Sequence, residues 1–404
     1  MGIDLEELYK DLHAHPELSF QEVRTAGIVA GHLDGLGLQV HRNIGKTGVA
    51  GVLRNGEGPV VMLRADMDAL PVKEATGLDY ASTAMGVDHQ GLEVPVMHAC
   101  GHDVHVTCLI GAVAELVRTQ LEWQGTLIAI FQPAEEFGGG ADTMVKDGLY
   151  DRIPKPQVVL GQHVAPVPAG WFGLRSGVAM ASADSLNITL HGRGGHGSRP
   201  ETTVDPVLMA AAATVRLQGV VAREIAASDS AVVTVGQLHA GTKNNIIPET
   251  ATLGLSIRSF SEPTREKVLA AVERIVRSEA AASGAAREPD FNYEERFPLT
   301  VNDDAAAQRV DAAFRQKFGA GQVMDPGPVS GSEDVGMLAT AAGAPLVFWF
   351  LGGIEPHYAK EFAESGRLPE DVPSNHSPYF APVIQPTLTL GTEALVTAAR
   401  EFLA

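Results

Sequence analysis

The amino-acid sequence predicts an α/β protein with two domains: a larger one with a mostly parallel sheet flanked by helices, and a smaller α+β one inserted into it. The 404 residues exceed what one small core accommodates. Short apolar runs alternate with helical patterns over the first part of the chain, which is typical of a parallel sheet covered by helices. This pattern changes near residue 181 and returns towards the C-terminus. We therefore expect one domain of residues 1–180 and 296–404, and an inserted domain of residues 181–295.

The larger domain opens with an amphipathic helix, in which Leu5, Leu8 and Leu12 form one apolar stripe. Its later elements are read from apolar runs bounded by turn residues. The expected strands are 47–55, 58–70, 125–136, 156–164 and 346–353, and the expected helices are 107–121 and 386–403.

The inserted domain contains two strand–helix–strand units within about a hundred residues. The expected strands are 183–195, 229–241 and 250–260, and the expected helices are 204–222 and 262–283. This order predicts an open antiparallel sheet of the ferredoxin-like type with helices on one face.

Composition excludes several classes of function. Lys and Arg number 30 against 49 Asp and Glu, a formal charge of −19, which disfavours binding to nucleic acid and to anionic membranes. No stretch of ~18 apolar residues predicts a membrane span. Cys100 and Cys108 are too few for a disulfide framework, and the charged N-terminus does not resemble a signal peptide. We expect a soluble cytoplasmic protein.

The densest group of potential metal ligands is HACGHDVH, which begins at His98. Two geometries are compatible with it. In a helix, His98, His102 and His105 would share one face. In an extended or turning segment, Cys100 and His102 would point the same way. Gly101 disfavours a helix at this point, so we expect the second geometry.

Further candidate ligands follow other predicted elements. Glu136 comes after LIAIFQPA, His163 comes after VVLGQ, and His376 lies in a later loop. Because ligand sites form beyond the carboxyl ends of parallel strands, we expect these side chains to converge with Cys100 and His102. Sulfur, imidazole and carboxylate donors together favour Zn²⁺, Mn²⁺, Co²⁺ or Ni²⁺ over Ca²⁺ or Mg²⁺. The alternatives are a buried redox thiol, which the absence of a CxxC pair disfavours, and purely structural histidines.

A series of motifs runs in order along the chain: RADMDALP (64–71), MHACGHDVH (97–105), QPAEE (132–136), GQH (161–163), GRGGHGSRPE (192–201), NNIIPE (244–249), GSEDVG (331–336) and NHSP (375–378). Together with the early HAHPELSFQE, they resemble the aminoacylase/carboxypeptidase group of co-catalytic metallopeptidases. Within that group they are most similar to the indole-acetyl-amino-acid and hippurate hydrolases. The resemblance covers essentially the whole chain, and it implies a dinuclear metal site. Its ligands would be Cys100, His102, Glu136, His163 and His376.

Glu135 and Glu136 are adjacent carboxylates after a predicted strand. Outside a helix, two such neighbours cannot face one ion in the same way, so we expect a division of labour. The resemblance implies that Glu135 is the general base and Glu136 a ligand. A metal lowers the pKa of its water towards ~7, so a nearby carboxylate can take the proton and pass it to the leaving nitrogen. A solvated acidic turn is the alternative, and the strand-end position disfavours it.

The neighbouring polar residues are given supporting roles. Asp68 in RADMDALP is expected to orient a ligand histidine. Asp66 is not assigned as a ligand, because the histidine that other branches of the family have at its position is absent. His98, His105 and Cys108 are expected to be core or supporting residues.

The inserted domain carries further candidate site residues. His196 lies among glycines in GRGGHGSRP, which permit close approach of the backbone to a ligand. The resemblance implies that His196 donates a hydrogen bond to the tetrahedral oxyanion, acting from the partner subunit of a homodimer. Asn245 and Arg258 are candidates for binding the substrate's carbonyl or carboxylate, Arg258 through its planar fork. A strand-end cap and a surface arginine are the respective alternatives.

These residues together predict a metal-dependent amidohydrolase that splits N-acyl amino acids into a carboxylic acid and an amino acid. Hydrolysis of peptides or carbamoyl amides is the alternative within the enzyme class. A non-catalytic scaffold is the alternative outside it, and the presence of Glu135 and of every implied ligand disfavours it. We expect two divalent transition-metal ions per subunit, Zn²⁺ or Mn²⁺ before Co²⁺ or Ni²⁺. The polar loop 353–375, which contains His357, is expected to border the substrate.

Overall fold

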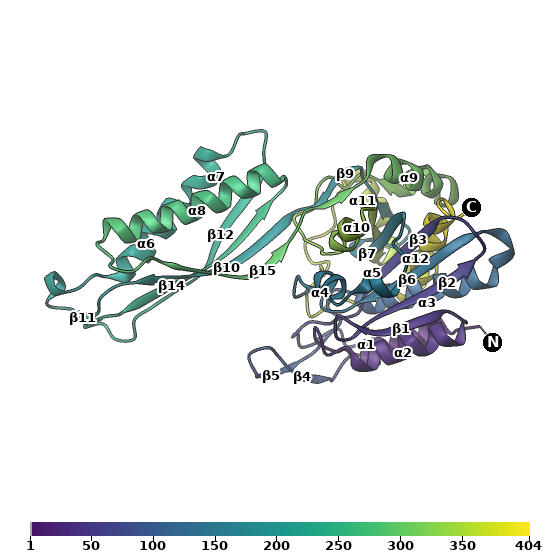
Figure 1. The fold of residues 1–404 in the computed structure, drawn as a ribbon, viewed down its shortest axis with the longest axis horizontal. Coiled ribbons are helices and arrows are strands. Elements are labelled where there is room, and N and C mark those ends of the chain that lie inside the picture. Colours follow the sequence, from purple (N-terminus) through teal and green to yellow (C-terminus); the bar gives the residue numbers. More distant parts are fainter. Residues whose placement is uncertain (1) are drawn as a thin grey trace. The chain divides into compact units, whose positions relative to one another are not determined.

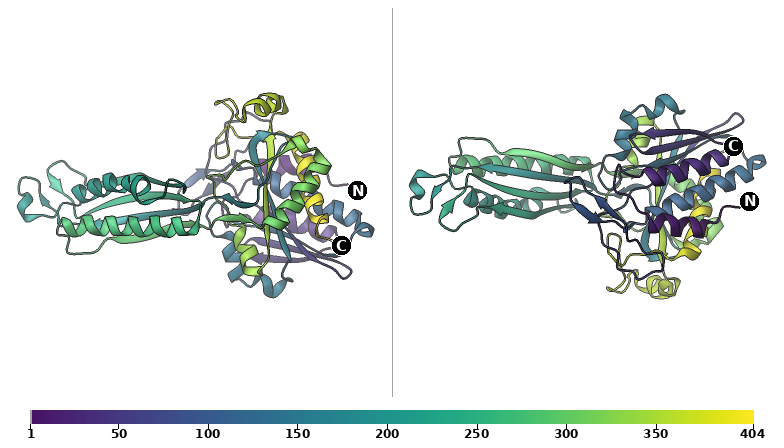
Figure 2. Two further views of the ribbon diagram at one scale, coloured as in Figure 1. Left: turned by 90° about the horizontal axis from the view of Figure 1, so that it is seen from above. Right: turned by 90° about the horizontal axis from the view of Figure 1, so that it is seen from below.

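The computed structural model describes residues 2–404, which form two compact units, each with its own sheet and core. Unit 1 comprises the chain up to Ala179, Val301–Gly327 and Asp334–Ala404, and unit 2 comprises Met180–Thr300 and Pro328–Glu333. Both described ends of the chain lie in unit 1 (Figure 2). The smaller unit is therefore inserted into the larger one.

The observed division differs from the predicted one at its boundaries, where Met180 and residues 296–300 belong to unit 2, and in one separate segment. Pro328–Glu333 was expected in the larger domain, but it packs with unit 2. The Ala181 N–H donates to the Val329 carbonyl over 2.9 Å, and Met180 forms an isolated parallel bridge with Val329. These backbone contacts explain why the segment belongs with the inserted unit.

The main sheet of unit 1 has eight strands in the order β1-β2-β6-β3-β7-β18-β8-β17. Its central strands β6, β3, β7 and β18 run parallel to one another, while β1 and β2 are antiparallel additions at one edge. The mostly parallel sheet predicted from the sequence is thus confirmed. The strands are β1 (Gln39–Ile44), β2 (Gly48–Asn55), β3 (Val60–Asp66), β6 (Gly125–Gln132), β7 (Val158–Pro168), β8 (Phe172–Gly173), β17 (Val323–Met324) and β18 (Leu346–Ile354).

Helices cover this sheet because its central strands are apolar on both faces: every residue of β6 is buried, as is nearly every residue of β3. Helices α3 and α12 pack against each other and against β3 and β7, whereas α4 and α10 contact β6 and β7 (Figure 1). The helices are α1 (Leu5–Ala14), α2 (Val23–Gly35), α3 (His102–Arg118), α4 (Gly140–Lys146), α5 (Leu149–Arg152), α9 (Asp304–Phe318), α10 (Gly336–Ala342), α11 (Ala359–Ser365) and α12 (Ile384–Arg400).

The first helix shows how local sequence sets these elements. The Asp4 carboxylate accepts hydrogen bonds from the backbone N–H groups of Glu6 and Glu7 and so caps α1. Leu8 and Leu12 on the same helix are buried in the core of unit 1. The remaining short strands that begin in unit 1 are the hairpin β4 (Met85–Val87) and β5 (Glu93–Pro95), and β9 (Gly177–Met180).

Unit 2 has a four-stranded antiparallel sheet in the order β12-β14-β10-β15. Residues along β14 are alternately buried and partly exposed, and helices α6, α7 and α8 cover the buried face (Figure 1). The chain order of its principal elements is strand–helix–strand–strand–helix–strand, the predicted α+β arrangement. The elements are β10 (Ser182–His191), β11 (Gly195–His196), α6 (Pro206–Leu217), α7 (Gly219–Glu224), β12 (Ala231–Ala240), β13 (Ile246–Ile247), β14 (Thr250–Ser259), α8 (Glu262–Ala282) and β15 (Asp290–Phe297). The short strand β16 (Thr300–Asn302) begins at the last residue of this stretch and continues in unit 1.

Among residues 2–404, no helix has both the length and the apolar character needed to cross a membrane.

Candidate metal centre and active site

Three neighbouring strands of unit 1 carry predicted site residues towards one edge of the sheet. The register pairs Asp66 of β3 with Gln132 of β6, and Arg64 of β3 with Gly161 of β7. Asp66 and His163 therefore lie at the same level of their parallel strands. This is the edge at which α/β sheets form their ligand sites.

The predicted ligands converge at this edge. The donor atoms of Cys100, His102 and Glu136 all lie within 4.8 Å of one another. The Cys100 Sγ atom lies 3.4 Å from His163 Nε2, and His376 Nε2 lies 3.3 Å from Glu136 Oε1. All five predicted ligands are thus linked in one cluster, in which only His376 is exposed.

The segment from His98 to His105 differs from the predicted extended geometry. Gly101 adopts a left-handed conformation, with φ 84°, and α3 begins at the next residue, His102. The prediction was right that Gly101 itself is not helical, but it was wrong for the residues after it. A glycine with positive φ turns the chain, and a helix can start directly after that turn. His102 consequently occupies the first turn of α3, and Cys100 lies in the turn before it.

The donor set fits divalent transition ions. The His102 Nε2 atom is buried and has no hydrogen-bond partner, an arrangement that is costly unless another group binds it. The His163 Nδ1–H donates to the Val164 carbonyl over 2.8 Å, which leaves the lone pair of Nε2 available towards Cys100. A thiol, imidazoles and a carboxylate form the mixed set that such ions bind.

The electrostatics of the cluster also suit a cation. Burial, followed by the charges of Glu136 and Glu135, raises the pKa of the Cys100 thiol well above its usual range. Burial alone would lower the pKa of His102, but the charges of Asp66 and Asp68 outweigh it and raise that pKa to about 10. A site that concentrates this much buried negative charge favours a positive ion.

Asp68 forms hydrogen bonds with two of the predicted ligands and with the segments around them. Its Oδ1 atom accepts from His102 Nδ1 over 3.2 Å and from the backbone N–H of Glu135 over 3.1 Å. Its Oδ2 atom accepts from the Ser19 hydroxyl over 2.7 Å and from the backbone N–H of Glu136 over 3.0 Å. The buried Asp68 carboxylate therefore orients His102 and the adjacent Glu135–Glu136 pair together.

His376 is held by a loop whose contacts could not be predicted from the sequence. Its backbone N–H donates to the Ala99 carbonyl over 2.8 Å. The side-chain amide of the preceding Asn375 donates to the carbonyls of Cys100 and Val164 over 3.1 and 3.2 Å. Asn375 thus connects the loop of His376 to the segments of two other predicted ligands, and its only sequence signal was membership of the NHSP motif.

A second polar group adjoins the cluster. The Asp66 carboxylate lies 2.5 Å from His105 Nδ1 and 2.8 Å from Arg64 Nη1, and His105 Nε2 accepts from the Val164 N–H. Burial tends to raise the pKa of Asp66, but His102, Arg64 and His105 hold it well below its usual value. Asp66 and His105 also lie within 4.8 Å of the donor atoms of His102 and His163, although both are bound by these protein contacts.

The remaining residues of the motif are buried. Both ring nitrogens of His98 lack a hydrogen-bond partner, and burial lowers the pKa of His98 to about 4, so its ring is neutral. The Cys108 thiol lies 3.6 Å from the Leu388 carbonyl in the core of unit 1.

The predicted residues of the inserted unit lie in two places. His196 of β11 pairs with Ile246 of β13, and the Gly197 N–H donates to the Asn245 carbonyl, so His196 and Asn245 are neighbours. Arg258 lies near the end of β14, about eight residues or ~26 Å of strand from Thr250 at its start. There its guanidinium donates to the Ser332 hydroxyl over 2.5 Å. His196 and Asn245 are exposed and Arg258 is half-buried.

The loop before His376 contains a short helix. His357 is exposed and its ring lies against that of Tyr358, with centroids 4.0 Å apart. Phe362 of α11 packs edge-on against Trp171, with centroids 5.2 Å apart.

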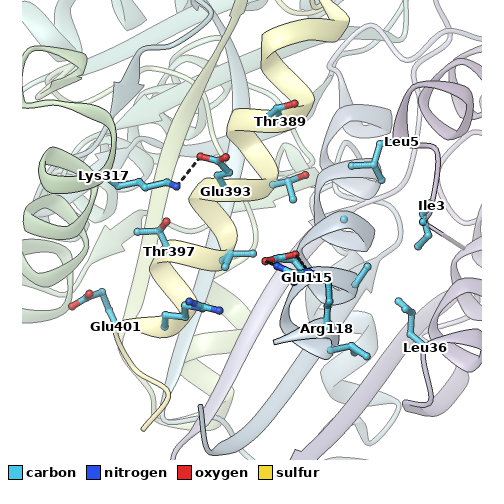
Figure 3. Close-up of a pocket in the computed structure, with 17 residues that line it drawn as sticks. Ile3, Leu5, Leu36, Glu115, Arg118, Lys317, Thr389, Glu393, Thr397 and Glu401 are labelled. Carbon is cyan, nitrogen blue, oxygen red and sulfur yellow. Dashed lines mark hydrogen bonds and ion pairs between the residues drawn. The ribbon is translucent and has the colours of Figure 1, made fainter. Parts of the chain in front are cut away.

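A groove of about 1030 Å³ lies elsewhere in unit 1, between α3, α12 and the start of α1. Figure 3 shows Ile3 and Leu5 on one side and Thr389, Glu393 and Thr397 on the other. None of the predicted site residues lines it. Lys317 and Glu393 form an ion pair of 3.2 Å within it, and the groove is separate from the predicted active site.

Comparison with known proteins gives consistent matches. Residues 62–373 match the family described as Peptidase family M20/M25/M40. Hippurate hydrolase of Campylobacter jejuni is 39% identical over 336 residues, 82% of this chain and 84% of that protein. Thermostable carboxypeptidase 2 of Saccharolobus solfataricus is 37% identical over 351 residues, 86% of this chain and 85% of that protein.

A solved structure shares the whole architecture. The Bacillus subtilis YXEP protein, described as a dinuclear metal binding peptidase from the M20 family, has a TM-score of 0.76 at 29% identity. The match covers 98% of this chain and 96% of that one. Together with the family match over residues 62–373, these likenesses show that the chain belongs to the M20/M25/M40 peptidase family.

Proposed function

We propose that this protein is a metal-dependent amidohydrolase that hydrolyses N-acyl amino acids to a carboxylic acid and an amino acid. The observation that carries the proposal is the buried cluster in which Cys100, His102 and Glu136 place their donor atoms within 4.8 Å of one another. The 39% identical hippurate hydrolase is named for an N-acyl amino acid substrate, which supports the same class here.

We propose two divalent transition-metal ions per subunit, Zn²⁺ or Mn²⁺ before Co²⁺ or Ni²⁺, held by Cys100, His102, Glu136, His163 and His376. The unpartnered His102 Nε2 atom supports this set, as does the likeness to a protein described as dinuclear. When bound, the ions would supply Lewis acidity, lowering the pKa of a water and polarising the amide carbonyl.

Glu135 is the proposed general base. Its side chain is 5% exposed, and its backbone N–H is bound to Asp68, next to the ligand Glu136. From this position its carboxylate would take a proton from the attacking water and deliver it to the leaving nitrogen. Asp68 would keep the His102 proton on Nδ1, so that Nε2 stays available as a ligand atom.

His196 is the proposed donor to the oxyanion. The backbone N–H of Ser198 donates to His196 Nδ1 over 3.1 Å, so in a neutral ring the proton lies on Nε2. The exposed Nε2–H is then free to stabilise the negative charge that develops on the carbonyl oxygen. Asn245, which is a neighbour of His196, would bind the substrate at that end of unit 2. Arg258 would bind a carboxylate at the other end of β14, beside Ser332.

We propose that His196 acts across a homodimer formed by unit 2. The strand β12 lies at the edge of the unit 2 sheet, where unpaired backbone groups can accept a second strand. Val232 and Leu238 on β12, and Leu208 and Val215 on α6, are exposed apolar residues of the same unit. A two-fold axis beside β12 would bury such a surface.

Peptide hydrolysis is the second candidate. The relative named thermostable carboxypeptidase 2 is 37% identical to this chain, a likeness close to that of hippurate hydrolase. We propose a cytoplasmic location for either activity, since both cysteines are free thiols, as is usual in reducing compartments.

The test is a substrate panel assayed before and after metal removal. N-acetyl, N-benzoyl and indole-acetyl amino acids would be compared with dipeptides and with N-carbamoyl amino acids. Chelation should abolish turnover, and Mn²⁺, Zn²⁺, Co²⁺ or Ni²⁺ should restore it, with N-acyl amino acids preferred. Full activity with metal content near zero would contradict the metal-dependent mechanism, and a preference for dipeptides would favour the second candidate.

A further inference from the structure

Three successive backbone N–H groups before and within the Glu135–Glu136 pair are bound by carboxylates. The Ala134 N–H donates to Glu22 Oε1 over 2.8 Å. The N–H groups of Glu135 and Glu136 donate to the two oxygens of Asp68 over 3.1 and 3.0 Å. Glu22 and Asp68 thus hold consecutive points of one turn, although Glu22 lies 112 residues from Ala134 along the chain.

Ala134 needs such an anchor because its backbone is in the left-handed region, with φ 49°. A residue with a Cβ adopts this conformation only when its surroundings impose it. Inside the turn, the Gly138 N–H donates to the Glu135 carbonyl over 2.7 Å and the Gly140 N–H donates to that of Ala134 over 3.1 Å. These two contacts involve the carbonyls of Ala134 and Glu135, whereas the N–H of Ala134 donates to Glu22.

Glu22 is itself fixed. Its side chain is fully buried, and it accepts from the Phe20 N–H over 2.8 Å as well as from the Thr47 hydroxyl. Phe20 is a second non-glycine residue with positive φ, 64°. One carboxylate therefore binds two strained backbone positions from distant parts of the sequence.

We propose that Glu22 is a positioning residue. It holds Ala134 in its left-handed conformation and thereby sets the orientation of the two residues that follow, Glu135 and Glu136. The inference rests on the proposed function for the roles of Glu135 and Glu136. Glu22 acts through the backbone, and its task is to accept a hydrogen bond.

The electrostatic setting indicates which substitution Glu22 tolerates. Burial, followed by the charge of Asp68, raises the pKa of Glu22 to about 7. A protonated carboxyl still presents one oxygen to the Ala134 N–H, and its proton can be donated to Thr47. Glutamine has the same shape and the same pair of acceptor and donor, whereas methionine fills the space without an oxygen acceptor.

The experiment compares Glu22→Met with Glu22→Gln in the full-length, metal-loaded protein. A displacement of the turn by about 1 Å would lower kcat by ~10²-fold in Glu22→Met, with KM changed less. Glu22→Gln should stay within ~3-fold of the unmodified protein, because the acceptor remains. Metal per subunit should fall in Glu22→Met as well, since the proposed ligand Glu136 belongs to the same turn.

The matched control is Glu17→Met. Glu17 lies in the same segment, and its carboxylate accepts from the N–H groups of Arg24 and Thr25 over 2.9 and 2.8 Å, without reaching the turn. Its replacement deprives two backbone N–H donors of their carboxylate acceptor, as Glu22→Met does, but should leave kcat and metal content unchanged. Equal losses of kcat in Glu17→Met and Glu22→Met would overturn the inference.

Amide hydrogen exchange gives a readout that does not depend on activity. The Ala134 amide should exchange at least ~10-fold faster in Glu22→Met and at nearly the original rate in Glu22→Gln. Unchanged exchange and kcat in Glu22→Met would overturn the inference. If unmodified protein shows no metal-dependent hydrolysis, the proposed function fails, while the exchange measurement still decides whether Glu22 anchors the turn.

Glu22→Asp provides a second variant if Glu22→Met does not fold. It keeps the negative charge but shortens the side chain by one methylene, so the carboxylate moves away from the Ala134 N–H. Faster exchange at Ala134 supports the inference, and exchange unchanged from the original protein overturns it.

Discussion

The Nδ1 atom of His102 lies 3.2 Å from Oδ1 of Asp68, and both side chains are buried. A carboxylate at this distance holds the imidazole proton on Nδ1, so that Nε2 faces Glu136 and Cys100 and can bind a cation that replaces its proton. The same carboxylate binds the backbone of Glu135 and Glu136. The orientation of His102, a proposed ligand, and that of Glu135, the proposed base, are therefore coupled through one side chain.

Asp68→Asn should weaken metal binding by about 10- to 100-fold, the usual effect of losing a carboxylate that orients a ligand histidine. The amide presents an N–H₂ group to one of the N–H donors that Asp68 now accepts from. Isothermal titration of the metal-free protein with Zn²⁺ or Mn²⁺ measures the change. Ser19→Ala, which removes only the hydroxyl bound to Asp68 Oδ2, is the control and should bind metal almost normally.

Cys100→Ser should lower metal content and turnover together, because a hydroxyl is a far poorer ligand than a thiolate. Cys108→Ser is the matched control, since Cys108 is buried in the core next to the Leu388 carbonyl and away from the donor cluster. Metal analysis of both purified variants checks the assignment. Normal metal content and turnover in Cys100→Ser would make Cys100 a structural residue.

The sequence predicted the large elements because their signals are local. Each central strand is an apolar run bounded by turn residues, and parallel strands align their carboxyl ends, so Glu136 and His163 could be expected at one edge. The motif resemblance supplied His376, which lies in a loop with no periodic pattern. Gly101 was read as a helix breaker over its whole segment, whereas the structure uses its positive φ to start α3.

Contacts between distant loops could not be predicted in this way. Glu22 and Asn375 are polar residues in irregular segments, and their partners are set by tertiary packing rather than by spacing. The packing of Pro328–Glu333 with unit 2 depends on a backbone hydrogen bond from Ala181, which leaves no trace in composition. Glu22 and Asn375 support the candidate site without belonging to the predicted set of site residues.

His13 should make the stability of the metal-free protein depend on pH. Its Nδ1 lies 2.6 Å from Asp103 and its Nε2 3.0 Å from Glu74, with Tyr9 and Tyr80 against the ring. Burial tends to lower the pKa of His13, but the hydrogen bonds to Asp103 and Glu74 outweigh it and raise that pKa to about 10. The protonated ring therefore contributes stability that is complete below pH ~6.5 and is lost as pH rises through about 10.

Urea unfolding of the original protein and of His13→Gln checks this dependence. The stability difference between them should shrink by up to ~1.4 kcal/mol per pH unit between about pH 7 and 10. The depressed pKa values of Asp103 and Glu74 keep both carboxylates charged throughout this range. His15→Gln, in which the replaced ring is exposed, should show no such trend. A pH-independent difference for His13→Gln would contradict the doubly bonded, protonated ring.

His196→Ala should reduce turnover with little loss of metal, because the residue belongs to unit 2 and its proposed role is to stabilise the oxyanion. Mixing His196→Ala protein with Glu135→Ala protein then tests the proposed dimer. Hybrid dimers contain one site with both residues intact if His196 acts across the interface, so part of the activity should return. No recovery, with subunit exchange demonstrated, would assign His196 to the site of its own chain.

The division of labour between Glu135 and Glu136 is tested most directly by metal per subunit beside residual rate in Glu135→Gln and Glu136→Gln. Glu135→Gln removes proton transfer but keeps size, so the rate should fall by at least ~10²-fold while metal occupancy stays nearly intact. Glu136→Gln should lose metal as well as rate, because an amide is a weaker ligand than a carboxylate. Loss of metal in Glu135→Gln but not in Glu136→Gln would reverse the two roles, and unchanged rates in both would contradict the mechanism.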